Sequence, residues 1–166
     1  MAKRHKTGSR PEVDSVRLRM QSLGAPTEVI ATELSRRYGY RPRQAYRLAQ
    51  GWNQTEAAQR YNQLIQARGP DHAGRDTMSP SRVSEYDRWP DSTRKPSVYA
   101  LATFAELYGT RIGCLLDAAD LEQLSPTERA AVLGPTTAPH PARPLTVVVM
   151  EAGTEPWRAL ERGNGD

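Results

Sequence analysis

A short predicted helix near the middle of the chain carries the side chains best suited to recognising a ligand. Ser79 suits the N-cap of this helix and Pro80 its first turn, where the missing proline amide leaves no donor unpaired. Val83 and Tyr86, three residues apart, are predicted to point into the core. The hydroxyl and charged side chains left on the other faces are Ser81, Arg82 and Glu85. Arginine can donate to guanine, glutamate can accept from cytosine and serine suits either, so the pattern is typical of a helix that packs on one side and meets DNA on the other.

No constellation typical of an enzyme accompanies these residues. The histidines, His5, His72 and His140, lie in predicted loops or tails without a partner at metal-ligand spacing. The single cysteine, Cys114, falls in an apolar run and is expected to be a small buried side chain rather than a reactive thiol. The sequence also lacks a glycine-rich phosphate loop and a nucleophile elbow. We therefore expect no catalysis, no metal site and no cofactor.

The positive charge of the chain is concentrated in its first third. Residues 1–50 contain 11 Lys and Arg against 4 Asp and Glu, whereas residues 51–166 contain 12 against 15, for a net charge of +4. Such asymmetry favours contact with a polyanion, most often nucleic acid, although many basic faces are only solvated. Residues 1–11 are expected to be a disordered basic arm, which could lie along phosphates or in a minor groove, or could be a free terminus.

Targeting signals are not expected in this sequence. No run of about 18 apolar residues exists, so we predict no membrane span. The basic N-terminus is not followed by the apolar segment of a secretory signal. A single cysteine cannot form an internal disulfide, which suits a reducing compartment. These features predict a cytoplasmic protein.

Residues 12–51 are predicted to form a basic N-terminal lobe of three short helices. Apolar residues recur at spacings of three and four in the first two helices, and glycines end them. The apolar positions are Val13, Val16, Leu18, Met20 and Leu23, then Val29, Ile30, Leu34 and Tyr38. Pro42 suits the first turn of the third helix, in which Arg43 and Arg47 stand one turn apart on one face. These two arginines could reach phosphates together; alternatively, the lobe only supports the domain that follows.

Residues 52–124 are predicted to form the principal helical domain. Asn53 and Glu56 have the spacing of a capping box at the start of its first helix. The most apolar helix of the chain begins near Val98 and ends at Gly109, and its apolar residues cover more than one stripe. We therefore expect that helix to lie at the centre of the core.

The remainder of the chain is predicted to hold one short helix, a linker and a tail. Ser125 and Glu128 form a second capping box within residues 125–144, which continue as a proline-rich linker. Residues 145–166 form a C-terminal tail with a β-prone run at 145–150. A lone strand is not stable. This run could pair with its copy in a dimer, add to a partner's sheet or pack on the helical body.

The ordered set of elements from Trp52 to Leu116 resembles the Xre/Cro/C1 helix-turn-helix family of phage-repressor-like transcriptional regulators. The whole arrangement from about Leu18 onward also resembles regulators common in actinobacteria. The family opens helix 2 with Ser-Gln and an Ala pair, follows with a Val-Ser helix 3 that ends on an acidic residue, and places a basic-Pro pair before an aromatic-rich helix 4. The corresponding residues are Asn53-Gln54, Ala57-Ala58, Met78-Ser79, Val83, Asp87-Arg88, Lys95-Pro96, Phe104 and Leu115-Leu116. The resemblance implies an all-α, lambda-repressor-like bundle, here with an extra N-terminal helical lobe and a short β-prone C-terminal tail.

The resemblance also implies roles for individual residues. Gln54, at the start of helix 2, would bond a phosphate, and helix 3, about residues 79–89, would enter the major groove. The residues that would face base edges are Ser79, Ser81, Arg82 and Glu85. The residues that would hold the DNA backbone are Arg88, Arg94 and Lys95. The alternative for each is a solvated side chain, and Glu85 could instead pair with Arg82 or Arg88.

Two features depart from the family pattern. Residues 61–77 replace the usual tight turn between helices 2 and 3, although loop length adds little entropic cost to the packing of the two helices. The reading face itself has little net positive charge. Much of the electrostatic attraction to DNA is therefore expected to come from the helices and the arm that precede it.

The sequence thus predicts a bacterial, nucleoid-associated transcription regulator that binds specific double-stranded DNA as a homodimer. A dimer is expected because one helix reads too few base pairs. The rival interpretation is a protein-interaction adaptor or antitoxin-like module built on the same scaffold. The acidic residues Glu85, Asp87 and Asp91 and the C-terminal tail, which could hold a protein partner, favour this rival.

Overall fold

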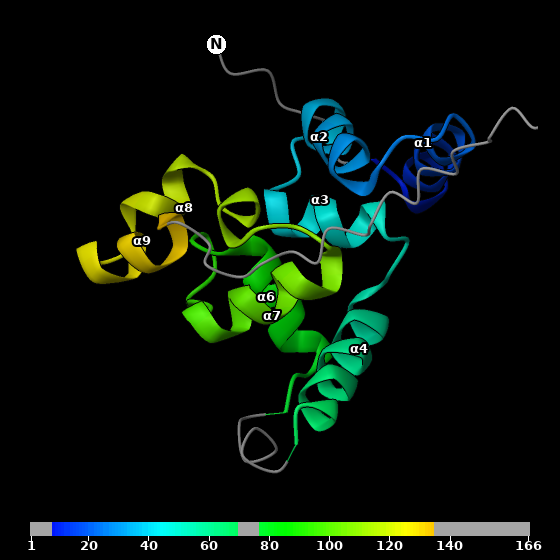
Figure 1. The fold of residues 1–166 in the computed structure, drawn as a ribbon. Coiled ribbons are helices and arrows are strands. Elements are labelled where there is room, and N and C mark those ends of the chain that lie inside the picture. The colour runs from blue at the N-terminus through cyan, green and yellow to red at the C-terminus, as the bar shows by residue number, and fades with distance from the viewer. Residues whose placement is uncertain (1–7, 70–76, 135–166) are drawn as a thin grey trace, which may run out of the picture. The chain divides into compact units, whose positions relative to one another are not determined.

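The computed structural model describes residues 8–69 and 77–134, in which every regular element is a helix and none is a strand (Figure 1). The elements are α1 (Arg10–Ser22), α2 (Thr27–Tyr38), α3 (Pro42–Ala49), α4 (Gln54–Ala67), α6 (Pro80–Arg88), α7 (Val98–Tyr108), the 3-10 helix η1 (Ile112–Leu115), α8 (Ala118–Glu122) and α9 (Pro126–Leu133). The all-α prediction is therefore confirmed for the described residues. The predicted arm up to residue 7, the linker from residue 135 and the strand at 145–150 lie outside them.

Helix ends follow the local chemistry expected of them. At the start of α4, the Asn53 side chain accepts from the Glu56 amide at 2.9 Å, and the Glu56 carboxylate accepts from the Asn53 amide at 2.7 Å. The Ser79 hydroxyl accepts from the Arg82 amide at 3.2 Å at the start of α6. Gly39 and Gly109 end α2 and α7 with φ of 68° and 66°, a left-handed conformation that side chains with a Cβ rarely adopt.

Helix α3 lies between the N-terminal helices and the rest of the bundle (Figure 1). It packs against α1 and α2 on one side and against α6 and η1 on the other. Six of its eight residues are buried, which explains how so short a helix can be held in place. Helix α4 packs along α6 and also contacts α7. The centre of the described region is thus α3 together with α7, rather than α7 alone.

The core is rich in aromatic rings. Phe104 on α7 lies 5.0 Å from Tyr61 and 5.7 Å from Tyr108, measured between ring centroids. Tyr108 in turn lies 6.2 Å from Tyr46 of α3 and 5.8 Å from Trp52, which precedes α4. These spacings suit aromatic pairs and tie α3, α4 and α7 together. A smaller cluster joins α7 to the C-terminal helices through Trp89, Leu101, Leu116, Leu124 and Val132.

Some predicted core positions are instead exposed. Leu18 and Leu23 of the first helix are 56% and 77% exposed, and Val29 of the second is 48% exposed. Helix α1 is at the edge of the bundle, so only the face that carries Val13 is covered by α2 and α3. Cys114 is half-buried rather than enclosed.

No helix in residues 8–69 or 77–134 is both long and apolar enough to cross a membrane. The same residues contain no cluster of histidine, cysteine or acidic side chains that could hold a metal ion.

Candidate nucleic-acid interface

Helix α6 divides into a packed face and a polar face, as its sequence predicts. Val83 and Tyr86 are buried, at 1% and 9% exposure, and Asp87 is buried beside them at 5%. Ser79, Ser81 and Arg88 are exposed on the remaining surface. Arg82 and Glu85 are half-buried on that surface. The four proposed base-facing residues therefore all come from α6 or its N-cap, on the part of the helix that the core does not cover.

An asparagine on α4 positions the start of α6. The Asn62 amide nitrogen donates to the Met78 carbonyl at 2.9 Å, and its carbonyl oxygen accepts from the Met78 amide at 2.8 Å. A tight turn would fix the position of α6 relative to α4. Here the connection is long, and this pair of hydrogen bonds fixes that position instead. Sequence reasoning missed Asn62, because a polar residue in a helix gives no local sign of a partner 16 positions away.

The side chains on the polar face also bond groups within the protein. One Arg82 nitrogen donates to the Thr77 carbonyl at 3.3 Å, and Arg88 donates to the Ser84 carbonyl one turn before it. Glu85 lies 3.7 Å from Arg94, across the end of the helix. The carboxylate of Glu85 therefore faces Arg94, rather than Arg82 or Arg88 as the sequence allowed. Gln54 is half-buried at the first position of α4.

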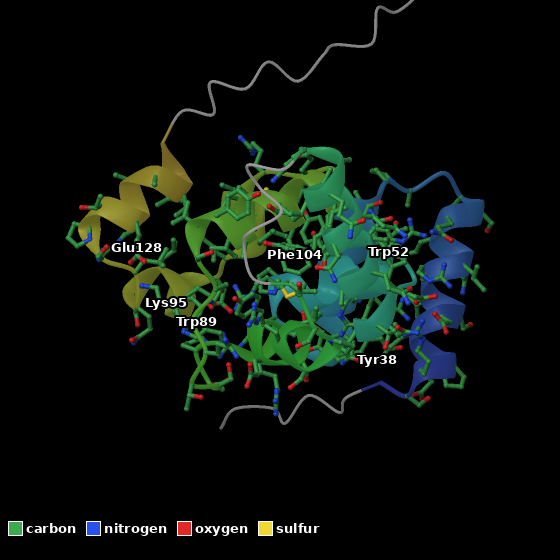
Figure 2. All side chains as sticks on the ribbon, turned by 90° about the horizontal axis from the view of Figure 1, so that it is seen from below. Tyr38, Trp52, Trp89, Lys95, Phe104 and Glu128 are labelled. Atoms are coloured by element: carbon green, nitrogen blue, oxygen red, sulfur yellow. The ribbon has the colours of Figure 1, made fainter. Side chains whose placement is uncertain are left out.

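Lys95 is engaged with the C-terminal helices. Its ammonium group donates to the Glu128 carboxylate at 2.6 Å and approaches the Gln123 carbonyl at 3.5 Å. Figure 2 shows Lys95 and Glu128 on the side of the molecule that carries α8 and α9. To bind a DNA phosphate, Lys95 would have to contact the phosphate and Glu128 at the same time, or break its ion pair with Glu128.

Glu128 is expected to titrate near pH 2 in the folded protein. Hydrogen bonds from Lys95 and from the Ser125 amide hold its pKa at about 2, below the usual 4.5. Because the folded-state pKa is depressed, the stabilisation is complete above about pH 4.5 and is lost as the pH falls toward 2. A pH titration of the Glu128 side-chain carbon by NMR measures this. Lys95→Gln should raise the pKa, and an ordinary value in the wild-type protein would contradict the contact.

Arg43 and Arg47 cannot serve as phosphate contacts in this structure. Each is only 2% exposed. Arg43 forms an ion pair with Asp120 at 2.7 Å, and Arg47 forms one with Asp87 at 2.6 Å. Burial raises the pKa of the Asp87 carboxyl and the facing Arg47 guanidinium lowers it in part, so this carboxylate depends on Arg47 for its charge. The prediction that these arginines reach DNA is wrong, because they face the core.

Part of the basic excess of the N-terminal third is neutralised by carboxylates from later in the chain, and other arginines of this third are paired within it. Arg36 and Arg37 both bond Glu33 and hold the pKa of that carboxyl at about 2. Arg41 bonds Asp91 at 2.7 Å and Asp117 at 2.9 Å. Further pairs link Asp14 to Arg10 and Arg17. The charge asymmetry therefore partly reflects arginines of the first third that meet carboxylates elsewhere in the chain, and it is weaker support for a polyanion partner than the count suggests.

Searches of protein-family models, curated proteins and solved structures find no match to this chain.

Proposed function

We propose that this protein is a sequence-specific, double-stranded DNA-binding transcription regulator. In this proposal α4 and α6 are helices 2 and 3 of a lambda-repressor-like bundle of the Xre/Cro/C1 type, and α6 enters the major groove. The observation that carries the proposal is the division of α6. Val83, Tyr86 and Asp87 are buried, whereas short hydroxyl and charged side chains occupy its outer surface. A helix with that composition on its free face has the groups that base edges recognise.

Within this proposal, the outer residues of α6 have separate tasks. Arg82 would donate to guanine O6 and N7, and Ser81 would bond a neighbouring base. Glu85 would accept from cytosine N4, with Arg94 holding it in place from 3.7 Å. Gln54, Arg88 and Arg94 would contact phosphates, which fix the register of the protein but carry no sequence information. Two copies of the chain would read two half-sites.

In vitro selection of bound DNA sequences by the full chain tests this function. We expect the wild-type protein to select a defined sequence with two related halves, and its affinity to fall as salt rises. Ser81→Ala with Arg82→Ala should relax the preference at about two positions and cost about 1–3 kcal/mol at each recognised base pair. Fluorescence titration against the selected duplex measures the loss.

A matched control is available on α1. Ser15 and Arg19 are exposed and lie four residues apart, so Ser15→Ala with Arg19→Ala removes the same chemical groups far along the chain from α6. This control should leave the selected sequence unchanged, even if overall affinity falls slightly. The function is contradicted if the wild-type protein shows no salt-dependent binding, or if the α6 variant selects the same sequence as the wild type.

A protein-interaction adaptor or antitoxin-like module is the second candidate. The observation in its favour is that several exposed cations are already matched by carboxylates, as in the pairs of Lys95 with Glu128 and Arg94 with Glu85. Such a surface attracts DNA less strongly than the formal charge suggests. Recovery of a stoichiometric protein partner by the full chain, with no co-purifying DNA and no selected sequence, would favour this function over the first.

A further inference from the structure

A single buried arginine connects the end of α6 to the C-terminal segment. Arg43 on α3 donates from Nε to the Tyr86 carbonyl at 2.7 Å and from Nη2 to the Trp89 carbonyl. From Nη1 it donates to the Leu115 carbonyl at 2.9 Å. The remaining two N–H groups bond the two oxygens of Asp120, at 2.7 and 2.9 Å. All five donors of the guanidinium group are thus used.

The carbonyls held by Arg43 belong to the C-terminal end of α6. Tyr86 lies in the last turn of that helix and Trp89 is its C-cap. Carbonyls in this position lack an intrahelical partner, so an outside donor is needed to satisfy them. The positive charge of Arg43 also suits this end of the helix dipole. Arg43 therefore determines where the C-terminal end of α6 is held.

Asp120 provides both the counter-charge for Arg43 and part of the cap of α8. It is 0% exposed, and its Oδ2 also accepts from the Asp117 amide at 2.9 Å. The Asp117 side chain accepts in return from the Asp120 amide at 3.0 Å. The carboxylate is correctly placed only when the first turn of α8 is formed. If α8 moved away, Arg43 would keep a buried charge without a counter-ion, which is strongly unfavourable.

We infer that Arg43 and Asp120 are positioning residues for the DNA-reading helix. Packing of α8 against Arg43, through Asp120, determines how well the C-terminal end of α6 is ordered. This inference rests on the proposed function only for the role of α6. The coupling between α8 and α6 is a property of the fold and is measured separately. Neither residue touches DNA; each acts through the backbone of α6. Asp87 and Arg88 lie in the same turn of α6, so the contact of Arg43 with this turn also orders them.

Amide hydrogen exchange of the full chain tests the coupling without DNA. Asp120→Asn keeps the shape of the side chain and removes its charge. We expect exchange in this variant to rise at least tenfold at residues 86–89, including the Trp89 amide that bonds the Glu85 carbonyl, with α2 and α4 little changed. Asp14→Asn is the matched control, since Asp14 pairs with Arg10 and Arg17 on α1. It should leave α6 unchanged.

DNA binding then tests the role in recognition. If the wild-type protein selects a DNA sequence, Asp120→Asn should lower affinity for that sequence at least tenfold more than affinity for random duplex. The slope of affinity against salt should stay the same, because no phosphate contact is removed. A residue needed only for overall stability would instead reduce the active fraction and both affinities equally. Equal losses therefore overturn the positioning role.

The two failures can be told apart. If the wild-type protein binds no DNA, the proposed function fails and the exchange experiment alone decides the coupling. A uniform rise in exchange across α2, α4, α6 and α7, or no rise at residues 86–89, overturns it. If Asp120→Asn does not fold, Asp117→Ala replaces it, because this change removes the side-chain cap of α8 without touching Arg43. Arg41→Gln controls for the Arg41–Asp117 ion pair, which any change of Asp117 removes. The Asp117 variant should also raise amide exchange at residues 86–89, by a smaller factor than Asp120→Asn. No rise at these residues overturns the inference.

Discussion

Asp87→Ala is expected to destabilise the protein by about 3–5 kcal/mol, the usual cost of breaking a buried ion pair by removing one partner. Arg47 would keep its charge in the core, where it is 2% exposed, and would lose both bonds to the Asp87 carboxylate, of 2.6 and 2.9 Å. Its remaining bond, to the Trp52 carbonyl at 2.8 Å, cannot balance a buried positive charge. Urea unfolding followed by circular dichroism measures the loss.

Two further variants separate the ion pair from the space that it fills. Arg47→Met with Asp87→Leu replaces both partners by apolar groups of similar volume and should recover most of the lost stability, because no unpaired charge remains. Asp14→Asn breaks a partly exposed pair on α1 and should cost about 0–1 kcal/mol. A loss for Asp87→Ala no greater than that of Asp14→Asn would show that the Arg47–Asp87 pair is not held in the core.

Phe104→Ala is expected to cost about 3–5 kcal/mol, the range for removing a buried aromatic ring. Phe104 is 4% exposed, and its ring lies between those of Tyr61 and Tyr108. Its loss would leave a cavity where α4 and α7 meet, and both tyrosine rings would lose an aromatic partner. Thermal and urea unfolding measure the change in stability.

The shape of the side chain provides the control for Phe104. Phe104→Leu keeps most of the apolar volume and should cost less than half of the alanine effect, because a smaller cavity remains. The helical circular-dichroism spectrum at low temperature should survive in the leucine variant. A loss of less than about 2 kcal/mol for Phe104→Ala would indicate that the site collapses freely around the missing ring, which would contradict a tightly packed aromatic core.

The helices and their ends could be predicted from the sequence because their causes are local. A capping box such as Asn53 with Glu56 is decided by residues three positions apart. Glycine ends α2 and α7 at Gly39 and Gly109 because it tolerates the left-handed conformation that the last turn requires. The packed face of α6 followed in the same way from the spacing of Val83 and Tyr86. For the candidate site, local patterns therefore predicted which residues of α6 remain on its surface.

The position of α6 relative to α4, and the burial of Arg43 and Arg47, could not be predicted in this way. Asn62 holds the start of α6 across 16 positions, and Arg43 meets Asp120 across 77. In the sequence, a solvated arginine, a phosphate-binding arginine and a core arginine carry the same charge and follow the same helical spacing. The structure distinguishes them by what covers the guanidinium group and by the acceptors around it.

The sequence by itself thus determined the helices, their caps and the polar composition of the exposed face of α6, because these depend on neighbours within one or two turns. Only the tertiary structure decided that α3 is central and that Arg43 and Arg47 are internal. An arginine can be buried only where acceptors from several segments satisfy its donors and a carboxylate balances its charge. For Arg43 those acceptors come from α6, η1 and α8, which meet only when the chain is folded.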